Sequence, residues 1–331
     1  KRTIDKAKAA KKDEFYTQLE DINNELRHYR EYFRGKTVLC NCDDPRVSNF
    51  FTYFAYNFEF LGLKKLITTC YKNQDMDLFS MNKSEQAVYL VYEGDKNGNH
   101  IPDAEEIGVK PLKGDGDFRS KECIELLKEA DIVVTNPPFS LFREYVAQLM
   151  KYDKKFLIIG NVNALSYKEI FPLVKDNRVW LGASIHSGDR KFWVPDTYEL
   201  NAAGCGIDDD GKKFIKVKGV RWFTNLDYKE RHDDIPLYKS YSPEEYPTYD
   251  NYDAINVGKT AEIPLDYDGV MGVPITFIDK YNPDQFEILG MSASAGYNAD
   301  IVGIPFKGDK DARPLVNGKN TYARIFIKKR K

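Results

Sequence analysis

Short apolar runs that alternate with amphipathic helical patterns are the feature that most constrains how this chain can fold. Four of these runs lie at residues 36–42, 64–70, 131–135 and 156–159, and helical spacing of apolar residues separates most of them. Short, nearly continuous apolar runs are typical of strands buried on both faces of a parallel sheet. We therefore predict an α/β fold of the Rossmann-like kind, with a mostly parallel sheet and helices on both faces.

Further elements follow from the same patterns. We expect helices over residues 19–33, 47–60, 120–128, 141–150 and 165–174, and further strands over 87–93, 107–112, 178–181, 191–195, 214–217 and 221–226. Beyond Asp227 the sequence changes to Tyr, Pro, Asp and Asn without a helical or strand period, until 263–277 and a final strand at 322–327. We therefore predict two domains: residues 1–226, with 1–34 as an N-terminal arm and helix, and a smaller loop-rich region over 227–331.

The composition limits which classes of protein this chain can belong to. The chain has 331 residues, 42% of them apolar, which is enough for a full core. No apolar run approaches membrane length, and the Lys-rich start has no apolar segment typical of a secretion signal. The five cysteines are an odd number without metal-type pairs, so we expect a reduced, cytoplasmic location and no membrane partner.

The charge is unevenly distributed although the net charge is only −2. Residues 1–12 hold six Lys or Arg against one Asp, and residues 301–331 hold nine against two acids. Residues 227–300 hold fifteen acids against five bases. The basic ends could contact nucleic-acid phosphates, or they could be solubilising tails.

The stretch Asp131–Phe139 suggests a chemistry. A buried strand ends in Asn136, Pro137, Pro138 and Phe139, and the two prolines fix the backbone of the turn. The carboxamide of Asn136 and the carbonyl of Pro137 are then available as acceptors for one planar amine, and Phe139 offers a flat face to its ring. Hydrogen bonding of both amine protons draws the nitrogen lone pair out of conjugation, which favours attack on an electrophile such as a methyl donor.

Asn-Pro-Pro-Phe after an apolar strand resembles the catalytic motif of S-adenosylmethionine-dependent amino-methyltransferases. The alternative is that Pro-Pro only terminates a strand. Phe15, Tyr16 and Thr17 likewise resemble an aromatic element that precedes the cofactor strand in many adenine methyltransferases and packs on the methionine end of the cofactor. A core pair followed by a helix cap is the alternative for these three residues.

Other candidate cofactor residues follow the predicted strands. Asp43, Asp44 and Pro45 end the first strand, and either aspartate could accept a hydrogen bond from the ammonium group of the cofactor. The loop has no glycine, which disfavours a pyrophosphate cradle.

Two later positions would complete such a cofactor site. Cys70 and Tyr71 end the second strand, where the ribose and adenine would lie. Asp117 and Phe118 would bind the adenine amino group and ring face, unless Gly-Asp-Gly at 114–116 is only a turn.

The segment between residues 93 and 107 permits two interpretations. Asn97-Gly98 between two strand runs is a hairpin signal. The spacing of Asp95, Asn97, Asn99, Asp103 and Glu106 resembles a calcium loop, but His100 replaces the glycine that such loops use at their tight turn. We therefore favour the hairpin and expect no metal.

Several segments together resemble the EcoRI-type adenine-specific DNA methyltransferases. They include 13–18, 40–50, 114–120 and 133–145, and also 249–256 and 269–277, so the resemblance runs over nearly the whole chain. It implies a cofactor-binding catalytic part first and a target-recognition part last, with S-adenosylmethionine as cofactor, double-stranded DNA as substrate and a flipped adenine methylated at N6.

The resemblance also bears on partners and rivals. It implies a restriction-modification or orphan modification enzyme, acting as a monomer, whose cognate endonuclease, where one exists, would form no stable complex with it. Two alternatives stay open: an RNA guanine-N2 or protein-glutamine methyltransferase with the same turn, and a non-catalytic DNA-binding protein on the same scaffold.

Overall fold

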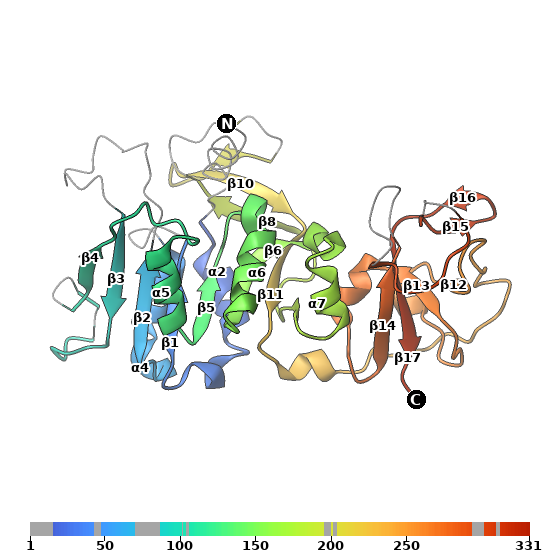
Figure 1. The fold of residues 1–331 in the computed structure, drawn as a ribbon, viewed down its shortest axis with the longest axis horizontal. Helices are drawn as coiled ribbons and strands as arrows, with labels where there is room; N and C mark the ends of the chain where they lie inside the picture. The colour runs from blue at the N-terminus through green and yellow to red at the C-terminus, as the bar shows by residue number, and fades with distance from the viewer. Residues whose placement is uncertain are drawn as a thin grey trace. The chain divides into compact units, whose positions relative to one another are not determined.

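The computed structural model describes residues 16–42, 48–69, 87–100, 102–103, 106–194, 200, 204–292, 301–308 and 312–331. The chain divides into two compact units, residues 1–162 with 182–226 and residues 163–181 with 227–331. Each unit has its own elements (Figure 1). No helix in these described ranges is long and apolar enough to cross a membrane.

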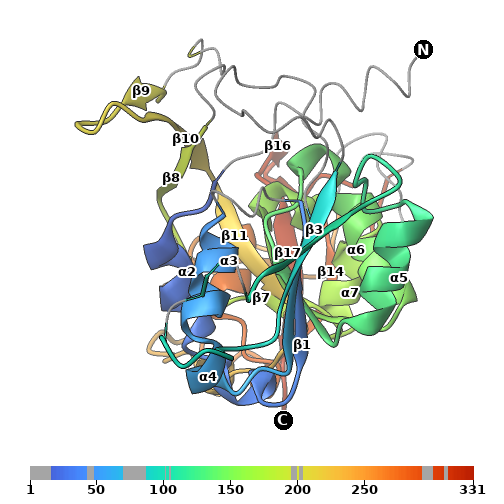
Figure 2. The same ribbon diagram turned by 90° about the vertical axis from the view of Figure 1, so that its left-hand side faces the viewer.

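The first unit is an α/β layer structure. Its helices are α2 (Leu19–Leu26), α3 (Asn49–Tyr56), α4 (Phe58–Leu61), α5 (Lys121–Glu129) and α6 (Phe142–Lys151). Its main strands are β1 (Thr37–Cys40), β2 (Lys65–Thr69), β3 (Val88–Tyr92), β4 (Gly108–Pro111), β5 (Ile132–Thr135), β6 (Lys155–Asn161) and β11 (Val220–Thr224). These strands follow one another in the order β4-β3-β2-β1-β5-β6-β11. Figure 2 shows α2, α3 and α4 on one side of the sheet and α5 and α6 on the other.

The centre of this sheet is parallel, as predicted. β2, β1, β5 and β6 pair in parallel, whereas β3, β4 and β11 are antiparallel to their neighbours. All residues of β1 and β5 are buried, and these strands are Thr-Val-Leu-Cys and Ile-Val-Val-Thr. Because helices cover both faces, apolar residues are needed on both sides of each central strand.

A second, small sheet of the first unit carries basic and aromatic residues. It contains β8 (Asp189–Trp193), β10 (Lys213–Lys218) and β9 (Gly206–Ile207), in that order. The ammonium group of Lys191 lies 4.4 Å from the ring centroids of both Trp193 and Phe214. The strands predicted at 191–195 and 214–217 correspond to β8 and β10. These two strands pair with each other, and β9 pairs with the other edge of β10.

The second unit is built around a four-stranded sheet. Its elements are α7 (Phe171–Lys175), β7 (Trp180–Leu181), β12 (Ile255–Asn256), β13 (Met271–Pro274), β14 (Phe286–Met291), β15 (Leu315–Val316), β16 (Lys319–Asn320) and β17 (Arg324–Lys329). The sheet order is β12-β13-β17-β14, and β15 pairs with β16. The tyrosine run that lacks a period in the sequence contributes buried Tyr246, Tyr249 and Tyr252 to this unit.

Three expected helices are shorter than predicted. The first ends at Leu26 and is followed by a 3-10 turn at Arg30–Phe33, because the amides of His28 and Tyr29 bond to carbonyls three residues back. The second breaks at Asn57, whose carboxamide donates to the Tyr53 carbonyl. The expected helix at 165–174 is a 3-10 turn at Val162–Ser166 followed by the short helix α7.

The expected hairpin is present, but its connection is not a tight turn. β3 and β4 pair with Val91 opposite Gly108, so residues 93–107 form one long loop in which Asn97-Gly98 is only a part.

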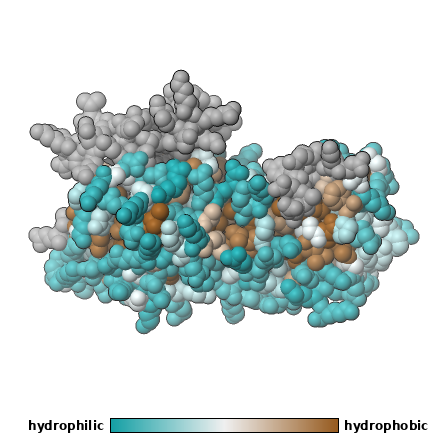
Figure 3. Space-filling model, in the orientation of Figure 1, coloured by the Kyte–Doolittle hydropathy of each residue, from teal (hydrophilic) through white to brown (hydrophobic). Residues whose placement is uncertain are grey.

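Polar residues dominate the face of the molecule seen in Figure 3, with apolar residues scattered between them.

Candidate active site at the carboxyl ends of the central strands

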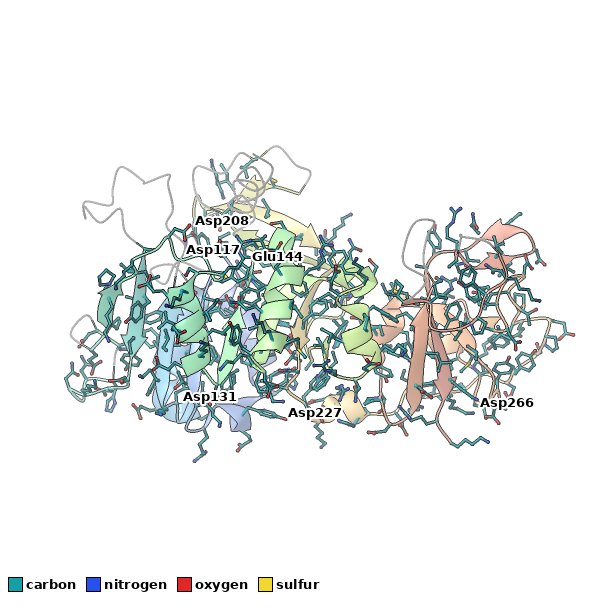
Figure 4. The ribbon with its side chains drawn as sticks, viewed as in Figure 1. Asp117, Asp131, Glu144, Asp208, Asp227 and Asp266 are labelled. Carbon is teal, nitrogen blue, oxygen red and sulfur yellow. The ribbon has the colours of Figure 1, made fainter. Side chains whose placement is uncertain are left out.

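The residues predicted for chemistry lie where the parallel strands of the first unit end. β5 begins next to Asp131 and runs to Thr135, directly before Asn136. In Figure 4, Asp131 lies at one end of the unit, whereas Asp117 and Glu144 lie together at the opposite end, near the start of α6. In open α/β sheets this carboxyl end of the strands is where ligands bind.

The turn after β5 is buried, and a residue from the N-terminal part of the chain is hydrogen-bonded to it. Asn136 is 6% exposed, Pro137 and Pro138 are buried, and Phe139 is half-buried at the start of a 3-10 turn that ends at Leu141. The Asn136 carboxamide nitrogen donates to the Thr17 hydroxyl at 3.3 Å. The two residues are 119 positions apart in the sequence, so this bond joins two predicted elements of the site.

Thr17 is itself fixed by the start of α3. Its carbonyl accepts a hydrogen bond from the Asn49 carboxamide at 2.6 Å, and its side chain is 1% exposed. The serine before Asn49 caps α3, because the Ser48 hydroxyl accepts from the amide of Phe50 at 3.2 Å. Tyr16 forms an antiparallel bridge with Trp193 of β8. The segment at Tyr16 and Thr17 therefore connects α3, the turn after β5 and the small sheet of β8, β10 and β9.

Asp117 is tied to a guanidinium group. Its carboxylate accepts from the Arg119 amide at 2.8 Å, from Nε at 2.9 Å and from Nη2 at 2.7 Å, and Arg119 also bonds to Glu144 at 2.9 Å. Burial alone would raise the pKa of Asp117, but the hydrogen bonds and charge of Arg119 outweigh it and lower this pKa. A carboxylate has about four lone-pair sites, so one acceptor position is left for a further donor.

Phe118 is mostly covered by protein. Its ring is 6% exposed, packs edge-to-face on Tyr145 at 5.0 Å and lies 5.3 Å from the Arg119 guanidinium carbon. Its carbonyl accepts from the Gln148 carboxamide at 3.0 Å. Little of the Phe118 ring is therefore open to a ligand.

The structure reveals three polar residues that the sequence analysis did not single out. The Tyr145 hydroxyl donates to the Asn41 carboxamide oxygen, and the Thr135 hydroxyl donates to the Asn41 carbonyl. Burial raises the pKa of Tyr145 well above its usual value, so its hydroxyl stays a donor. These two hydrogen bonds join the ends of β1 and β5 to α6, whose Tyr145 also packs on Phe118. Polar residues directly after buried strands are the signal that could have identified Asn41.

The remaining predicted cofactor residues are Phe15, Asp43, Asp44, Pro45, Cys70 and Tyr71, and all six lie outside the described residues. Cys42, directly before residues 43–47, has φ 68°. This left-handed conformation is uncommon outside glycine and turns the chain sharply after β1. Because β1 and β5 pair in parallel, Cys42 lies at the same edge of the sheet as Asn136.

Comparison with known proteins identifies relatives over the full length. Type II methyltransferase M.EcoRI of Escherichia coli is 52% identical, covering 100% of this chain and 97% of that protein. Type II methyltransferase M.MgeORF184P of Mycoplasma genitalium is 39% identical and covers 98% of each chain. Type II methyltransferase M.MpnI of Mycoplasma pneumoniae is also 39% identical, covering 99% of this chain and 98% of that protein.

No solved structure matches the fold. The family described as adenine-specific methyltransferase EcoRI matches residues 3–330. With a family match over almost every residue and a relative at 52% identity, the chain belongs to the EcoRI family of adenine-specific methyltransferases.

Proposed function

We propose that this chain, an adenine-specific DNA methyltransferase by its family, methylates N6 of an adenine flipped out of double-stranded DNA, at Asn136. The observation that carries this proposal is the buried carboxamide of Asn136, held by Thr17 at the end of β5. The hydrogen bond from the Asn136 amide nitrogen to Thr17 fixes the rotation of the carboxamide. Its oxygen is then set in one direction as an acceptor.

The chemistry needs positioning more than acid–base catalysis. S-adenosylmethionine supplies the methyl group as part of a sulfonium, whose sulfur leaves with the bonding electrons. Asn136 Oδ1 and the Pro137 carbonyl accept hydrogen bonds from the two N6–H groups, so the N6 lone pair is directed toward the methyl carbon. As the new N–C bond forms, the nitrogen gives up one proton, which passes to solvent. Fixing the reacting atoms in line supplies most of the catalytic advantage.

The residues described in the first unit suit this cofactor. Asp117 keeps one acceptor site for an adenine amino group beside its three bonds to Arg119. Phe118 follows it in the sequence and is 6% exposed. We propose that Phe15, Tyr16, Thr17, Asp43 or Asp44, Pro45, Cys70 and Tyr71 complete the cofactor site, as the family resemblance implies.

We propose that Phe139 holds the target base. It follows the two prolines and is half-buried. Extruding a base costs a few kcal/mol, and stacking on an aromatic ring returns about 1–3 kcal/mol. Together with the two hydrogen bonds to N6, this offsets the loss of stacking in the duplex.

The small sheet of β8, β10 and β9 is a second candidate contact for DNA. Lys191, Lys213, Lys216 and Lys218 are partly or fully exposed on it, and Tyr16 bridges to its Trp193. Phosphate contacts by such residues make affinity fall steeply with salt. We also propose that residues 227–331 read the target sequence, and that the chain acts as a cytoplasmic monomer of a modification system whose endonuclease, where present, binds separately.

The test is methyl transfer from tritiated S-adenosylmethionine to duplex DNA, ribosomal RNA and protein. We expect transfer to DNA, with the product identified as N6-methyladenine. Asn136→Ala should lower kcat by about 100-fold or more while calorimetry shows nearly unchanged cofactor binding. Asn57→Ala, which removes an asparagine carboxamide at the end of α3, is the matched control and should stay active.

Three outcomes would contradict the proposal. Full activity of Asn136→Ala would remove the assigned role of that residue. Transfer to RNA or protein but not DNA would favour the other methyltransferase classes. A chain that binds DNA but never S-adenosylmethionine would be a non-catalytic binding protein.

A further inference from the structure

The loop between β3 and β4 has the residue spacing of a calcium-binding loop of the EF-hand type. Counted from Asp95, oxygen-bearing side chains occupy positions one, three, five, nine and twelve: Asp95, Asn97, Asn99, Asp103 and Glu106. These are the side-chain ligand positions of a twelve-residue calcium loop, and the twelfth is the glutamate that binds the ion through both oxygens. Position seven, residue 101, lies outside the described residues.

The sequence argument against calcium was His100, which stands at position six in place of glycine. In the structure His100 has φ 61° and therefore adopts the left-handed conformation that this position requires. Its amide donates to the Asp95 carboxylate at 2.9 Å, and the Gly98 amide donates to the same carboxylate at 2.7 Å. The loop thus makes its tight turn without glycine, at a modest cost in backbone energy.

Glu106 supplies an independent indication of a ligand. Its side chain is buried, with 8% of the residue exposed. Oε1 accepts from the amides of Lys96 at 2.5 Å and Asn97 at 3.2 Å, which directs the carboxylate into the loop. Oε2 is buried and no donor bonds to it, while the Asp95 carboxylate lies close enough to interact with Glu106. A buried carboxylate oxygen without a partner is costly, and a bound cation would remove that cost.

The asparagines show what takes the place of an ion in this arrangement. The carboxamide nitrogens of Asn97 and Asn99 both donate to Asp103 Oδ2, at 2.7 and 2.8 Å. No three His, Cys, Asp or Glu side chains in the described ranges are already arranged around one metal position. A carboxamide presents oxygen instead of nitrogen after a half-turn of its terminal bond, so a small rearrangement converts these donors into ligands.

We propose that residues 95–106 bind one calcium ion through Asp95, Asn97, Asn99, Asp103 and Glu106. Three carboxylates and two amide oxygens suit Ca²⁺, which takes six to eight oxygen ligands in flexible geometry, better than Mg²⁺, which requires a near-ideal octahedron. The ion would clamp the long connection between β3 and β4, at the edge of the main sheet (Figure 1). Because two ligands are neutral, the affinity should be modest, with a Kd of about 10⁻⁴ M.

The test is calcium titration of the full chain by calorimetry and by terbium luminescence, with Tyr92 as the nearby sensitiser. We expect one site per chain and a higher Tm with 5 mM Ca²⁺ than with the chelator EGTA, with concentrations chosen around the expected Kd of about 10⁻⁴ M. Glu106→Gln should weaken binding about tenfold or more and remove the Tm shift. Glu125→Gln, an exposed carboxylate on α5, is the matched control and should bind as the parent chain does.

A variant expected to bind calcium more tightly keeps the proposal testable if Glu106→Gln fails to fold. Asn97→Asp adds a fourth carboxylate and should tighten calcium binding several-fold. No saturable calcium binding by the parent chain at 5 mM, or the same binding in Glu106→Gln as in Glu125→Gln, would overturn the proposal. So would equal binding by the parent chain and Asn97→Asp.

Discussion

The two compact units bury polar side chains in different ways. In the first unit, buried polar side chains bond to side chains far away in the sequence: Asn136 to Thr17, and Glu25 to the hydroxyl of Ser184. In the second unit, the buried tyrosine hydroxyls bond mainly to backbone carbonyls, as Tyr252 does to Ala312. A bond to a backbone carbonyl secures a fold. Bonds between side chains of distant segments also fix the positions of reactive groups, so substitutions in the two units should have different consequences.

The largest expected effect is at Glu25. Its carboxylate is fully buried and accepts from the amides of Ala183 and Ser184, both at 2.8 Å, from the Ser184 hydroxyl and from the Tyr29 hydroxyl. Glu25→Ala leaves these donors unsatisfied and should lower the free energy of unfolding by about 3 kcal/mol, measured by urea denaturation. Tyr252→Phe in the second unit should cost about 1 kcal/mol.

The control for Glu25 is Glu20→Ala, which removes an exposed carboxylate from the same helix and should be nearly neutral. Equal losses for Glu25→Ala and Tyr252→Phe would break the comparison between the units.

Asp117→Ala should weaken S-adenosylmethionine binding by about tenfold to 30-fold, because a hydrogen bond to a charged group is lost. Calorimetry measures this Kd directly. Glu144→Ala is the informative partner variant, since it removes the other carboxylate on Arg119 and leaves Asp117 in place. Equal weakening by both variants would show that Asp117 acts only through Arg119.

The lowered pKa of Asp117 leads to a prediction about how cofactor affinity depends on pH. Its pKa is lowered, so the carboxylate stays ionised throughout the neutral range. Cofactor affinity should therefore change little between pH 6 and pH 8 on account of this residue, which titrates only below its ordinary pKa of about 4.

A smaller effect is expected for Tyr145→Phe, which removes the hydroxyl that bonds to Asn41. Asn41 precedes the loop that contains Asp43 and Asp44, so cofactor Kd should rise about fivefold while stability falls by about 1 kcal/mol. Tyr249→Phe in the second unit loses bonds to Asn256 and Gly272 and should cost similar stability without changing Kd. If both variants changed Kd alike, the distinction between structural and positioning hydroxyls would fail.

The smallest effect concerns His232 of the second unit. Hydrogen bonds to Asp284, at 2.5 Å, and to Asp227, at 2.8 Å, raise the pKa of this imidazole. A raised pKa stabilises the folded chain fully below the unfolded pKa of about 6.5, and this contribution disappears as pH rises through the folded value. His232→Gln should therefore lower Tm at pH 5.5 by about 1 °C and leave it unchanged at pH 8.5, since the pair is solvent-exposed.

The central strands could be predicted from sequence because their burial is a local property of composition. The apolar runs before residues 41 and 136 contain β1 and β5, both fully buried. Helix ends were less predictable, since α2 stops at Leu26 although the apolar spacing continues to Tyr29. The choice between α-helical and 3-10 hydrogen bonds there depends on tertiary contacts, such as the bonds from the Ala183 and Ser184 amides to Glu25.

The candidate site was predictable in part. The Asn136 turn was identified because two prolines after a buried strand are locally unusual. The support from Asn41 and Tyr145 was not, since their bond joins residues 104 positions apart and leaves no periodic signal. In the loop at 95–106 the spacing was visible in the sequence, whereas the left-handed conformation of His100 was not.

The bond between Thr17 and Asn136 has a consequence for biosynthesis. Chains leave the ribosome with the N-terminus first, at about 5–20 residues per second. Thr17 therefore emerges well before its partner, which lies 119 residues later. On the role proposed for Asn136, a chain whose synthesis has not reached residue 136 cannot transfer a methyl group, so a half-made chain should pose no risk of premature DNA modification.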